Sequence, residues 1–406
     1  MKILIINTEI FRGGAAQIAL RLYHALNESA EISSYFLYGK GPRVSNRKAF
    51  RFTWGPEVYL HAFLTRVTGL QGYGTLVSTK RLVDFIVREK FDVIHLHNLH
   101  GYYLDLSFVQ SLGKLGIPIV WTLHDGWPIT GRCAYLSECN SWKIGCGNCP
   151  NLSWYPKTYF DSSAFMWKKK KEYFNSGWKP IIVCPSQWLA DRVKESYLNK
   201  FKIEVIPNGV DTEIFKPKDK IEIRKKLKIA LSKKVILSVA ANLRDERKGA
   251  KYFFEALQHI KTNNWMILTM GKKINLNREV KAKVDIKQLG YISDKNLISD
   301  IYNATDVFCS TSLDEVFGLT ATESMACGTP VVGFKVGGIP EQVTEDCGIL
   351  VSPRDEKALG RAIEHLLTDD KMRQEMSLNC RKRAEQKYNI EKFTKRYIQV
   401  YRELIK

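Results

Sequence analysis

Two glutamates, Glu315 and Glu323, lie on either side of a short segment, Phe317–Thr320, that we expect to open a helix. Backbone N–H groups at the start of a helix are positively polarised and bind anions. Gly318 would let a ligand approach the backbone closely. A phosphate held there would leave one carboxylate on each side to accept hydrogen bonds from a polyol. Thr320 and Glu323 also fit a capping box, so a purely structural role is open at this point.

A basic loop precedes the predicted helix Gly249–His259 and contains Arg244, Arg247 and Lys248. Arginine and lysine side chains in a loop before a helix are suited to binding a diphosphate. The two acids between the arginines could instead pair with these cations, which would make the segment an ordinary solvated loop.

In the first half of the chain, Gly13 and Gly14 follow a predicted strand and open a predicted helix. They do not form the Gly-x-Gly-x-x-Gly sequence of dinucleotide-binding proteins, which removes the main support for hydride transfer. Four of the eight histidines lie at or just beyond predicted strand ends, and we expect structural roles for two of them, His95 and His100. The other two are His97 and His124, and His124 with Asp125 resembles a hydrolase pair, but the chain has no Gly-x-Ser-x-Gly motif.

Short, charge-free apolar runs alternate with amphipathic helices along the chain, which predicts parallel strands buried on both faces. The pattern restarts after Pro207–Gly209, so we expect an α/β fold with two doubly wound, Rossmann-like domains. Ligands of such domains bind at the carboxyl ends of the strands, and a cleft between two facing domains is the expected site. The predicted domains are 1–211 and 212–388, with a helix over 389–406 that packs back on the first domain.

Residues Ser310–Glu341 combine the glutamate pair with a buried strand and a Gly-Gly turn, and they closely resemble the donor half of retaining glycosyltransferases of family 4, which have the GT-B fold. Further similarity runs through most of the chain. It lies in Gly13–Gly14, Asp92–His97, Thr122–Asp125, Pro185–Ser186, Ile206–Asp211 and the basic loop that ends at Lys248–Gly249.

This resemblance implies a role for each matching residue. Glu315 would face the hydroxyls of the donor sugar, Glu323 would accept from the ribose, and His124 would contact the sugar. The backbone amides of Phe317, Gly318, Leu319 and Thr320 would face the diphosphate and sugar, Gly13 and Gly14 would lie beside the diphosphate, and His97 would line the acceptor side.

The family also has an arginine six positions before the lysine of the basic loop, where this chain has Asn242. The resemblance therefore implies that Arg244 or Arg247 substitutes for it. Glu315 and His124 are the expected catalytic residues.

The activity implied is transfer of a sugar, with retention of configuration and without a catalytic metal, from a UDP- or GDP-sugar to a hydroxyl of a glycan in polysaccharide biosynthesis. The expected acceptor is lipid-linked. Two alternatives stay open: a nucleotide-sugar 2-epimerase, which shares the two-domain architecture, and a non-catalytic protein that binds a glycan or a nucleotide sugar.

Four of the nine cysteines cluster in the segment 131–150, with the spacing Cys-x5-Cys-x6-Cys-x2-Cys. Four thiolates within seventeen residues suit tetrahedral zinc, so we expect a structural zinc site there, with free thiols or a redox pair as the alternative. Its ligands would be Cys133, Cys139, Cys146 and Cys149.

The 406-residue chain carries a formal charge of +20, spread over both halves, which favours anionic partners. Met166–Phe174 joins aromatic residues to four consecutive lysines, and Trp142, Trp154 and Trp178 lie nearby. Two interpretations are open: the segment docks on an anionic membrane surface, or it is an ordinary solvated helix face. No recognised nucleic-acid-binding module is present. Without a signal-peptide core or an apolar run of membrane-spanning length, we expect a cytoplasmic protein, with peripheral membrane association as an option.

Overall fold

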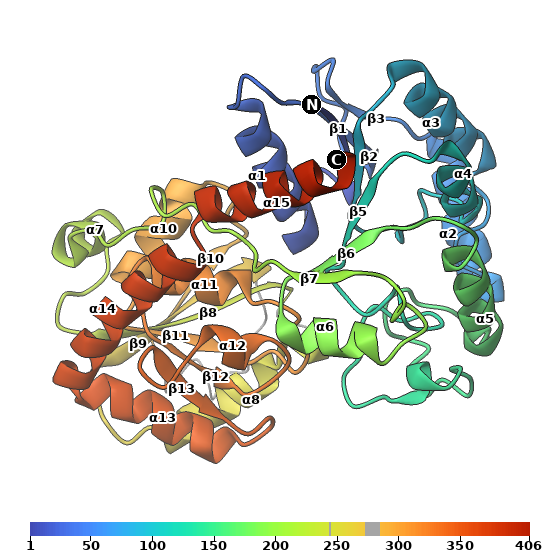
Figure 1. Cartoon of the computed structure of the whole chain (residues 1–406). Helices are drawn as coiled ribbons and strands as arrows, with labels where there is room; N and C mark the ends of the chain where they lie inside the picture. Colours follow the sequence, from blue (N-terminus) through green and yellow to red (C-terminus); the bar gives the residue numbers. More distant parts are fainter. Residues whose placement is uncertain (243–244, 273–284) are drawn as a thin grey trace. The chain divides into compact units, whose positions relative to one another are not determined.

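The computed structural model describes residues 1–242, 245–272 and 285–406. The chain divides into two compact units, the first made of Met1–Pro207 with Phe393–Lys406 and the second of Asn208–Lys392 (Figure 1). The first unit ends a few residues before the predicted boundary at 211. Each unit contains one sheet, and in each sheet every strand pair is parallel.

The first unit has a seven-stranded sheet with the order β3-β2-β1-β4-β5-β6-β7. Because β1 pairs with β2 on one side and with β4 on the other, the connections reverse direction at β1. The elements are β1 (Lys2–Glu9), α1 (Gly14–Asn27), β2 (Ser33–Lys40), β3 (Ala49–Arg51), α2 (Gly55–Thr68), α3 (Leu76–Glu89), β4 (Val93–Leu96), α4 (Ser107–Leu115), β5 (Ile119–Thr122), η1 (Ser141–Lys143), α5 (Ser163–Phe174), β6 (Ile181–Cys184), α6 (Gln187–Lys194) and β7 (Ile203–Val205).

The second unit has a six-stranded sheet with the order β10-β9-β8-β11-β12-β13, and its connections reverse direction at β8. The two parallel sheets confirm the predicted fold class. The elements are α7 (Lys220–Lys226), β8 (Lys234–Asn242), η2 (Glu246–Lys248), α8 (Ala250–Ala256), η3 (Leu257–His259), β9 (Trp265–Lys272), β10 (Ile286–Gly290), α10 (Lys295–Ala304), β11 (Val307–Ser310), α11 (Leu319–Ala326), β12 (Val331–Phe334), α12 (Ile339–Gln342), β13 (Gly348–Val351), α13 (Glu356–Thr368) and α14 (Asp370–Lys387).

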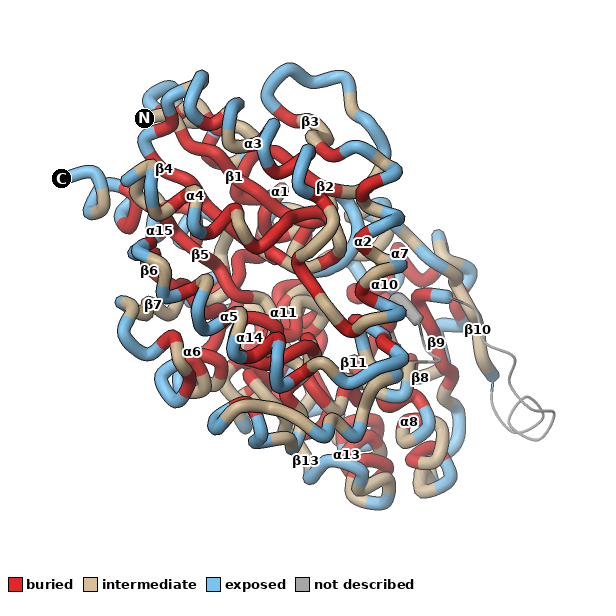
Figure 2. Tube along the Cα trace, turned by 90° about the vertical axis from the view of Figure 1, so that its right-hand side faces the viewer, coloured by how far each residue is buried: buried red, intermediate tan, exposed pale blue. Residues whose placement is uncertain are grey.

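The central strands of both sheets are buried on both faces, as their charge-free sequences predict (Figure 2). In β4, β5, β6 and β12 every residue is buried. The strands therefore form rigid platforms, and the loops at their carboxyl ends carry the polar side chains described below.

The last helix, α15 (Ile390–Ile405), belongs to the first unit from Phe393 onward, and Figure 1 shows it in red. Tyr401 Oη lies 2.6 Å from Nδ1 of His95 on β4, and Tyr397 Oη lies 2.8 Å from Oγ1 of Thr122 on β5. The two tyrosines are fully buried, so α15 completes the core of the first unit.

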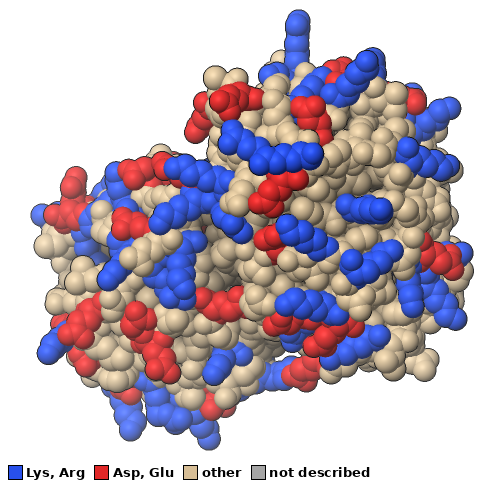
Figure 3. Space-filling model, viewed as in Figure 1, with Lys and Arg blue, Asp and Glu red and all other residues tan. Residues whose placement is uncertain are grey.

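Charged side chains of both signs are spread over the face of the molecule seen in Figure 3, with Lys and Arg in excess over the whole sequence. Among the described residues, no helix combines the length and the hydrophobicity that a bilayer-crossing segment needs.

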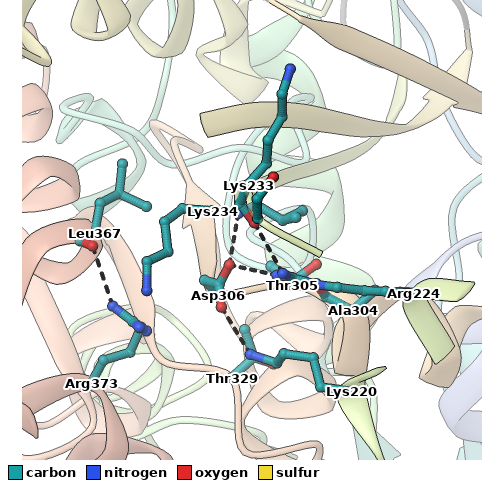
Figure 4. A network of polar contacts seen from close by, with 12 residues as sticks. Lys220, Arg224, Lys233, Lys234, Ala304, Thr305, Asp306, Thr329, Leu367 and Arg373 are labelled. Atoms are coloured by element: carbon teal, nitrogen blue, oxygen red, sulfur yellow. Dashed lines mark hydrogen bonds and ion pairs between the residues drawn. The ribbon is translucent and has the colours of Figure 1, made fainter. Parts of the chain in front are cut away.

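A buried ion-pair network lies at the amino ends of the strands of the second unit (Figure 4). Asp306, just before β11, accepts from Arg224 Nη2 at 2.6 Å, from Lys220 Nζ at 2.9 Å and from the backbone N–H of Val235 at 2.7 Å. Burial alone would raise the pKa of Asp306, but the charges of Lys220 and Arg224 and these hydrogen bonds outweigh it and lower the pKa below its usual value. The network joins α7 to the start of β8 and β11.

Candidate active site

In the second unit, the loops that follow β8 and β11 meet at the reversal point of the sheet, where ligands of doubly wound folds bind. The loop after β8 carries Lys248, and the loop after β11 carries Glu315. Lys248 Nζ lies 2.7 Å from Glu315 Oε2 and 3.4 Å from Ser312 Oγ. The lysine and glutamate side chains are 24% and 22% exposed, so this ion pair is accessible to a ligand.

Close backbone contacts hold the two loops together. Gly249 has a positive φ of 63°, and a Cβ atom there would come within 2.0 Å of the carbonyl oxygen of Thr311. The hydroxyl of Thr311 donates to the carbonyl of Lys248 at 3.0 Å, and Leu313 N–H donates to the carbonyl of Arg247 at 2.7 Å. The position of Lys248 is therefore fixed by the backbone on both sides.

A second glycine turn fixes the backbone of Glu315. Gly337 has φ of 55°, and a Cβ atom there would come within 1.9 Å of the carbonyl oxygen of Glu315. Gly338 N–H donates to that same oxygen at 3.0 Å. The sequence contains this Gly-Gly turn, but nothing in its spacing indicates that it supports a residue more than twenty positions earlier.

The structure describes only one of the two arginines that were predicted to bind the diphosphate. Arg244 lies outside the described residues. Arg247 donates to Asp314 O at 3.2 Å and pairs with Asp245 Oδ2 at 3.3 Å, so its guanidinium group is engaged in organising the loops. Asp245 also caps η2 by accepting from the N–H of Arg247 at 3.1 Å. Asp245, one of the two acids between the arginines, thus pairs with a cation of the same loop, as expected if the segment is an ordinary solvated loop.

Helix α11 begins at Leu319, with Gly318 as its cap residue and without a side-chain cap. The Thr320–Glu323 capping box is therefore not formed. The side chain of Phe317 is buried and packs edge-to-face on Tyr388, with ring centroids 5.8 Å apart, so only its backbone can serve a ligand. Thr320 and Glu323 lie in the first turns of α11 and are partly exposed.

Two of the predicted amides at this helix start already have acceptors within the protein. Leu319 N–H donates to the carbonyl of Phe317 at 3.1 Å. With its side-chain amide oriented to satisfy both groups, buried Gln342 accepts from Gly318 N–H at 3.2 Å and donates to the carbonyl of Gly318 at 3.3 Å. A ligand would have to replace these bonds, so Gln342 is a site residue that the sequence did not indicate.

In the first unit, Gly13 and Gly14 lie at the carboxyl end of β1, beside the reversal point of that sheet. Gly13 has φ of 89°, and a Cβ atom there would meet no atom within 4 Å. The turn is held by Gln17, whose side chain donates to the carbonyl of Phe11 at 2.7 Å. The glycine conformation and the open space around it leave the backbone accessible at the start of α1.

Three of the four strand-end histidines form a cluster beyond β4 and β5. His97 Nδ1 lies 2.8 Å from His124 Nε2, and the two rings stack with centroids 5.1 Å apart. His95 and His97 are fully buried, whereas His124 is partly exposed. Burial lowers the pKa of His124 to about 4, lowers that of His95 to about 3 and holds that of His97 well below its usual value. The cluster is therefore neutral at pH 7.

The hydrogen bonds of this cluster indicate which nitrogen of His124 carries the proton. His97 Nε2 is buried and, within the described part of the chain, has no hydrogen-bond partner. A buried donor without an acceptor is rarer than a buried acceptor without a donor. We therefore assign the His97 proton to Nδ1, which donates to His124 Nε2. His124 then carries its own proton on Nδ1 and can donate it to a ligand.

Next to this cluster, His100 Nε2 lies 2.7 Å from Asp125 Oδ2, and Asp125 Oδ1 accepts from Trp127 N–H at 2.9 Å. His100 Nδ1 lies 3.3 Å from Tyr155 Oη. Asp125 thus pairs with His100 and not with the adjacent His124, which gives a structural reason to set the His124–Asp125 hydrolase pair aside.

The neutral histidines should make the first unit sensitive to mild acid. Because the folded-state pKa of His95 lies below the ordinary value of about 6.5, its contribution to stability is complete above pH 6.5 and is lost as the pH falls. Between pH 7 and pH 5 one such histidine should cost about 2 kcal/mol of unfolding free energy. We therefore expect the unfolding free energy to fall less between pH 7 and pH 5 in His95→Gln than in the unmodified protein. Urea unfolding followed by tryptophan fluorescence measures this difference.

The control for this measurement is exposed His24, whose replacement by Gln should leave the pH dependence unchanged. Tryptophan is a suitable reporter because eight of the nine tryptophans lie in the first unit, and only Trp265 lies in the second. An identical pH dependence in His95→Gln and the unmodified protein would contradict the assignment of a neutral, buried His95.

The predicted zinc site is not supported by the structure. Among the residues it describes, no three His, Cys, Asp or Glu side chains are arranged to hold a metal ion. Cys133, Cys139, Cys146 and Cys149 are free thiols, and two of them meet protein donors. Gly131 N–H donates to Cys146 Sγ at 3.1 Å, and Arg132 lies 3.8 Å from Cys149 Sγ.

The aromatic residues of the basic segment on α5 do not form a surface. Met166, Trp167 and Phe174 are buried, as are Trp142 and Trp178, because they pack in the core of the first unit. Lys170 is also fully buried, with Nζ 4.0 Å from the ring centroid of Trp127, and burial lowers its pKa to about 7. This part of the predicted membrane-docking segment is wrong.

Both units match families of known proteins. Residues 12–214 match the family described as Glycosyltransferase Family 4, and residues 219–383 match the family described as Glycosyl transferases group 1. The chain is 27% identical over 378 residues to the putative colanic acid biosynthesis glycosyl transferase WcaC of Escherichia coli K12, covering 87% of this chain and 88% of that protein.

A further relative, the UDP-Gal:alpha-D-GlcNAc-diphosphoundecaprenol alpha-1,3-galactosyltransferase of Escherichia coli, is 29% identical over 52% of this chain and 57% of its own. Among solved structures, sucrose-phosphate synthase of Thermosynechococcus elongatus superposes with a TM-score of 0.76 at 20% identity, over 99% and 98% of the two chains. Anabaena Alr3699/HepE, solved with UDP and glucose, superposes over both whole chains with a TM-score of 0.71 at 17% identity. These structural likenesses concern the fold.

Proposed function

The chain belongs to glycosyltransferase family 4 and is a glycosyltransferase, and on this premise we propose that it transfers a sugar, with retention of configuration, from a UDP- or GDP-sugar to a hydroxyl of a lipid-linked glycan in bacterial polysaccharide biosynthesis. The names of the two Escherichia coli relatives support the biosynthetic role and the lipid-linked acceptor. The neighbour solved with UDP and glucose makes UDP-sugars the first donors to test. A lipid-linked acceptor would bring the enzyme to a membrane surface.

The observation that carries this proposal is the Lys248–Glu315 ion pair at the reversal point of the second sheet, close to the start of α11. Without a ligand, the lysine neutralises the glutamate. A bound donor can satisfy both groups separately, because its diphosphate is an acceptor for the lysine and its sugar hydroxyls are donors to the glutamate. The site therefore favours a ligand that carries both a diphosphate and sugar hydroxyls over a ligand that carries only one of these groups.

In the reaction we propose, the acceptor oxygen forms a bond to the anomeric carbon as the bond from that carbon to the diphosphate breaks. The bonding electron pair leaves with the diphosphate, and a diphosphate oxygen takes the proton of the acceptor hydroxyl. The protein supplies orientation and stabilises the departing negative charge. Lys248 and the start of α11 are the groups best placed for the second task, and no covalent intermediate with the protein is needed.

The roles of the first-unit residues remain predictions from the family. We propose that the Nδ1 proton of His124 contacts an oxygen of the transferred sugar, and that Gly13 and Gly14 lie beside the diphosphate. Because His97 is fully buried, we revise its role from the acceptor side to that of a positioning residue, which holds His124 in one tautomer through the 2.8 Å hydrogen bond.

A thermal-shift screen with UDP, GDP and their sugars tests donor binding directly. A nucleotide present at about 100 times its dissociation constant should raise the unfolding free energy by about 2.7 kcal/mol. We expect UDP or GDP to stabilise the protein, and Glu323→Ala to weaken this effect because the ribose loses an acceptor. Stabilisation by neither nucleotide would overturn the proposal.

Product analysis then separates the remaining outcomes. Incubation of the matching donor with a lipid-linked acceptor should release the nucleoside diphosphate and yield a glycosylated lipid. Conversion of the donor to an isomer without an acceptor, seen after chromatographic separation, would indicate an epimerase. Donor binding without turnover against a broad panel of acceptors would indicate a binding protein.

A further inference from the structure

Helix α2 turns its apolar side to the surface. Its buried side chains are the polar residues Glu57, His61 and Thr65, spaced one helical turn apart. Its exposed side chains include Tyr59 at 79% and Phe63 at 62% exposure. A helix on the surface of a soluble domain normally has the opposite arrangement.

Specific hydrogen bonds hold α2 in this orientation. Glu57 accepts from the backbone N–H groups of Val77 and Ser78, at 2.8 and 2.9 Å, and so satisfies the start of α3. His61 Nε2 accepts from Gly72 N–H at 2.9 Å, and the hydroxyl of Thr65 donates to the carbonyl of Leu70 at 2.8 Å. Rotating α2 to bury its apolar side would break all of these bonds, so the exposure is built into the fold.

Neighbouring segments enlarge the exposed apolar area. The start of α3 and the segment 159–160 lie beside the two ends of α2, since Tyr159 N–H donates to the carbonyl of Arg66 at 2.8 Å and Ser162 Oγ donates to that of Thr68 at 2.6 Å. Nine of the nineteen large apolar side chains that are exposed among the described residues lie here. We name them the α2 surface: Trp54, Tyr59, Leu60, Phe63, Val67, Leu76, Val77, Tyr159 and Phe160.

The charges around the α2 surface are mostly positive. Exposed Arg66, Lys80, Arg81 and Lys157 lie on or beside the segments that carry it, against two exposed acids, Asp84 and Asp161. The acidic residue of α2, Glu57, is buried and already used. Figure 2 faces the side of the molecule that carries α2 in Figure 1 and shows exposed segments along it. Aromatic and aliphatic side chains bordered by lysine and arginine are typical of a surface that lies in a membrane interface.

We propose that the α2 surface docks the first unit on an anionic lipid membrane, with its apolar side chains at the level of the acyl chains and the basic border at the headgroups. A second copy of this chain is the less favourable occupant, because a two-fold dimer through this surface would bring the same basic borders together. The proposal agrees with a lipid-linked acceptor in the proposed function, but it rests on the surface alone.

Cosedimentation of the full chain with lipid vesicles tests the proposal. We expect binding to vesicles of phosphatidylcholine with 30% phosphatidylglycerol, and weaker binding to phosphatidylcholine alone or in high salt. Leu60→Ser with Phe63→Ser should reduce the affinity for the anionic vesicles at least tenfold. The matched control is Ile221→Ser with Leu378→Ser, which removes two apolar side chains that are 57% and 74% exposed in the second unit, and it should bind as the unmodified protein does.

Other outcomes would overturn the proposal. These are a lack of binding to anionic vesicles, equal loss in the control variant, or unchanged binding in the α2 variant. Sedimentation velocity without lipid is measured in parallel. If the unmodified protein is a dimer and the α2 variant is a monomer, the surface binds a second copy of the chain instead. Stabilisation by UDP or GDP is recorded for the same variants. It should be unchanged, which separates failure of membrane docking from failure of the proposed donor site.

Discussion

Replacing Lys248 by alanine is expected to lower kcat/KM for sugar transfer by about 10²–10³-fold, the typical effect of removing one group that stabilises developing negative charge. Lys248 Nζ is the cation that meets Glu315 at the reversal point of the second sheet, 2.7 Å from its carboxylate. The assay is initial-rate release of nucleoside diphosphate in the presence of acceptor. Folding should be retained, because the side chain is partly exposed.

Lys251→Ala is the matched control. Lys251 lies three residues further along, on α8, where its side chain is 75% exposed and contacts only Glu255 at 3.8 Å among the ion pairs of the described residues. Its removal should leave kcat/KM within about twofold, as expected for an exposed pair of little energetic value. Near-normal activity of Lys248→Ala would contradict the assignment.

A double variant distinguishes catalysis from simple charge balance. If Lys248 only neutralised Glu315, then Glu315→Gln in the Lys248→Ala background would restore activity. If the two side chains serve different parts of the donor, the double variant should be at least as inactive as either single variant. We expect the second result, because a diphosphate and a sugar hydroxyl need partners of opposite character.

Replacing Asp306 by alanine should destabilise the second unit by about 3–5 kcal/mol, because it leaves the buried guanidinium group of Arg224 without its counter-ion. The Asp306 and Arg224 side chains are each 6% exposed. Hydrogen exchange measured by mass spectrometry over β8 and β11 would report the change. Asp285→Ala is the control. The Asp285 side chain is 50% exposed, so its ion pair with Lys233 should contribute less than about 1 kcal/mol.

The same aspartate gives a defined pH dependence. Because the folded-state pKa of Asp306 is lowered, its contribution is complete above the unfolded value of about 3.9 and is lost as the pH falls through the folded value. Replacing Arg224 by methionine in the Asp306→Ala background should recover part of the stability, because it removes the uncompensated charge. Equal hydrogen exchange in the Asp306 and Asp285 variants would contradict this account.

The fold could be predicted because buried parallel strands have a distinctive sequence. Val93–Leu96 and Val331–Phe334 contain no Asp, Glu, Lys or Arg, and every residue of both strands is buried. Strands that lie near a sheet edge or carry polar residues give a weaker signal. Strand β10 contains Lys287 and Gln288, and β2 begins with two serines. Where a strand is only partly buried, apolar periodicity loses its contrast with a loop.

The candidate site could be predicted at Lys248 and Glu315 because each follows a strand and belongs to a recognisable motif. Their pairing could not, since it depends on two glycine turns, at Gly249 and Gly337, that bring separate loops within contact distance. Gln342 was missed for a related reason. It is the last residue of the short helix α12, directly after the motif Ser310–Glu341, and contributes through a single buried amide.

The zinc prediction is not supported and the α5 prediction is wrong in part, and both have a common reason: composition indicates residue types but not the direction in which side chains point. The four cysteines have suitable types for metal binding, yet Gly131 and Arg132 contact two of the thiols instead. The tryptophans near α5 looked like surface anchors and are core residues. Conversely, the sequence of α2 gives no indication that Glu57 and His61 are buried, because their partners lie in the following loop and helix.

The return of α15 to the first unit means that the second unit is, in effect, an insertion within the first. Buried His95 bonds to Tyr401, a residue 306 positions later in the chain. On the ribosome, the first sheet therefore emerges long before the helix that covers it, and buried His95 must wait for a partner 306 residues later in the chain. Ending the chain before Tyr401 should thus damage the part of the protein that is made first.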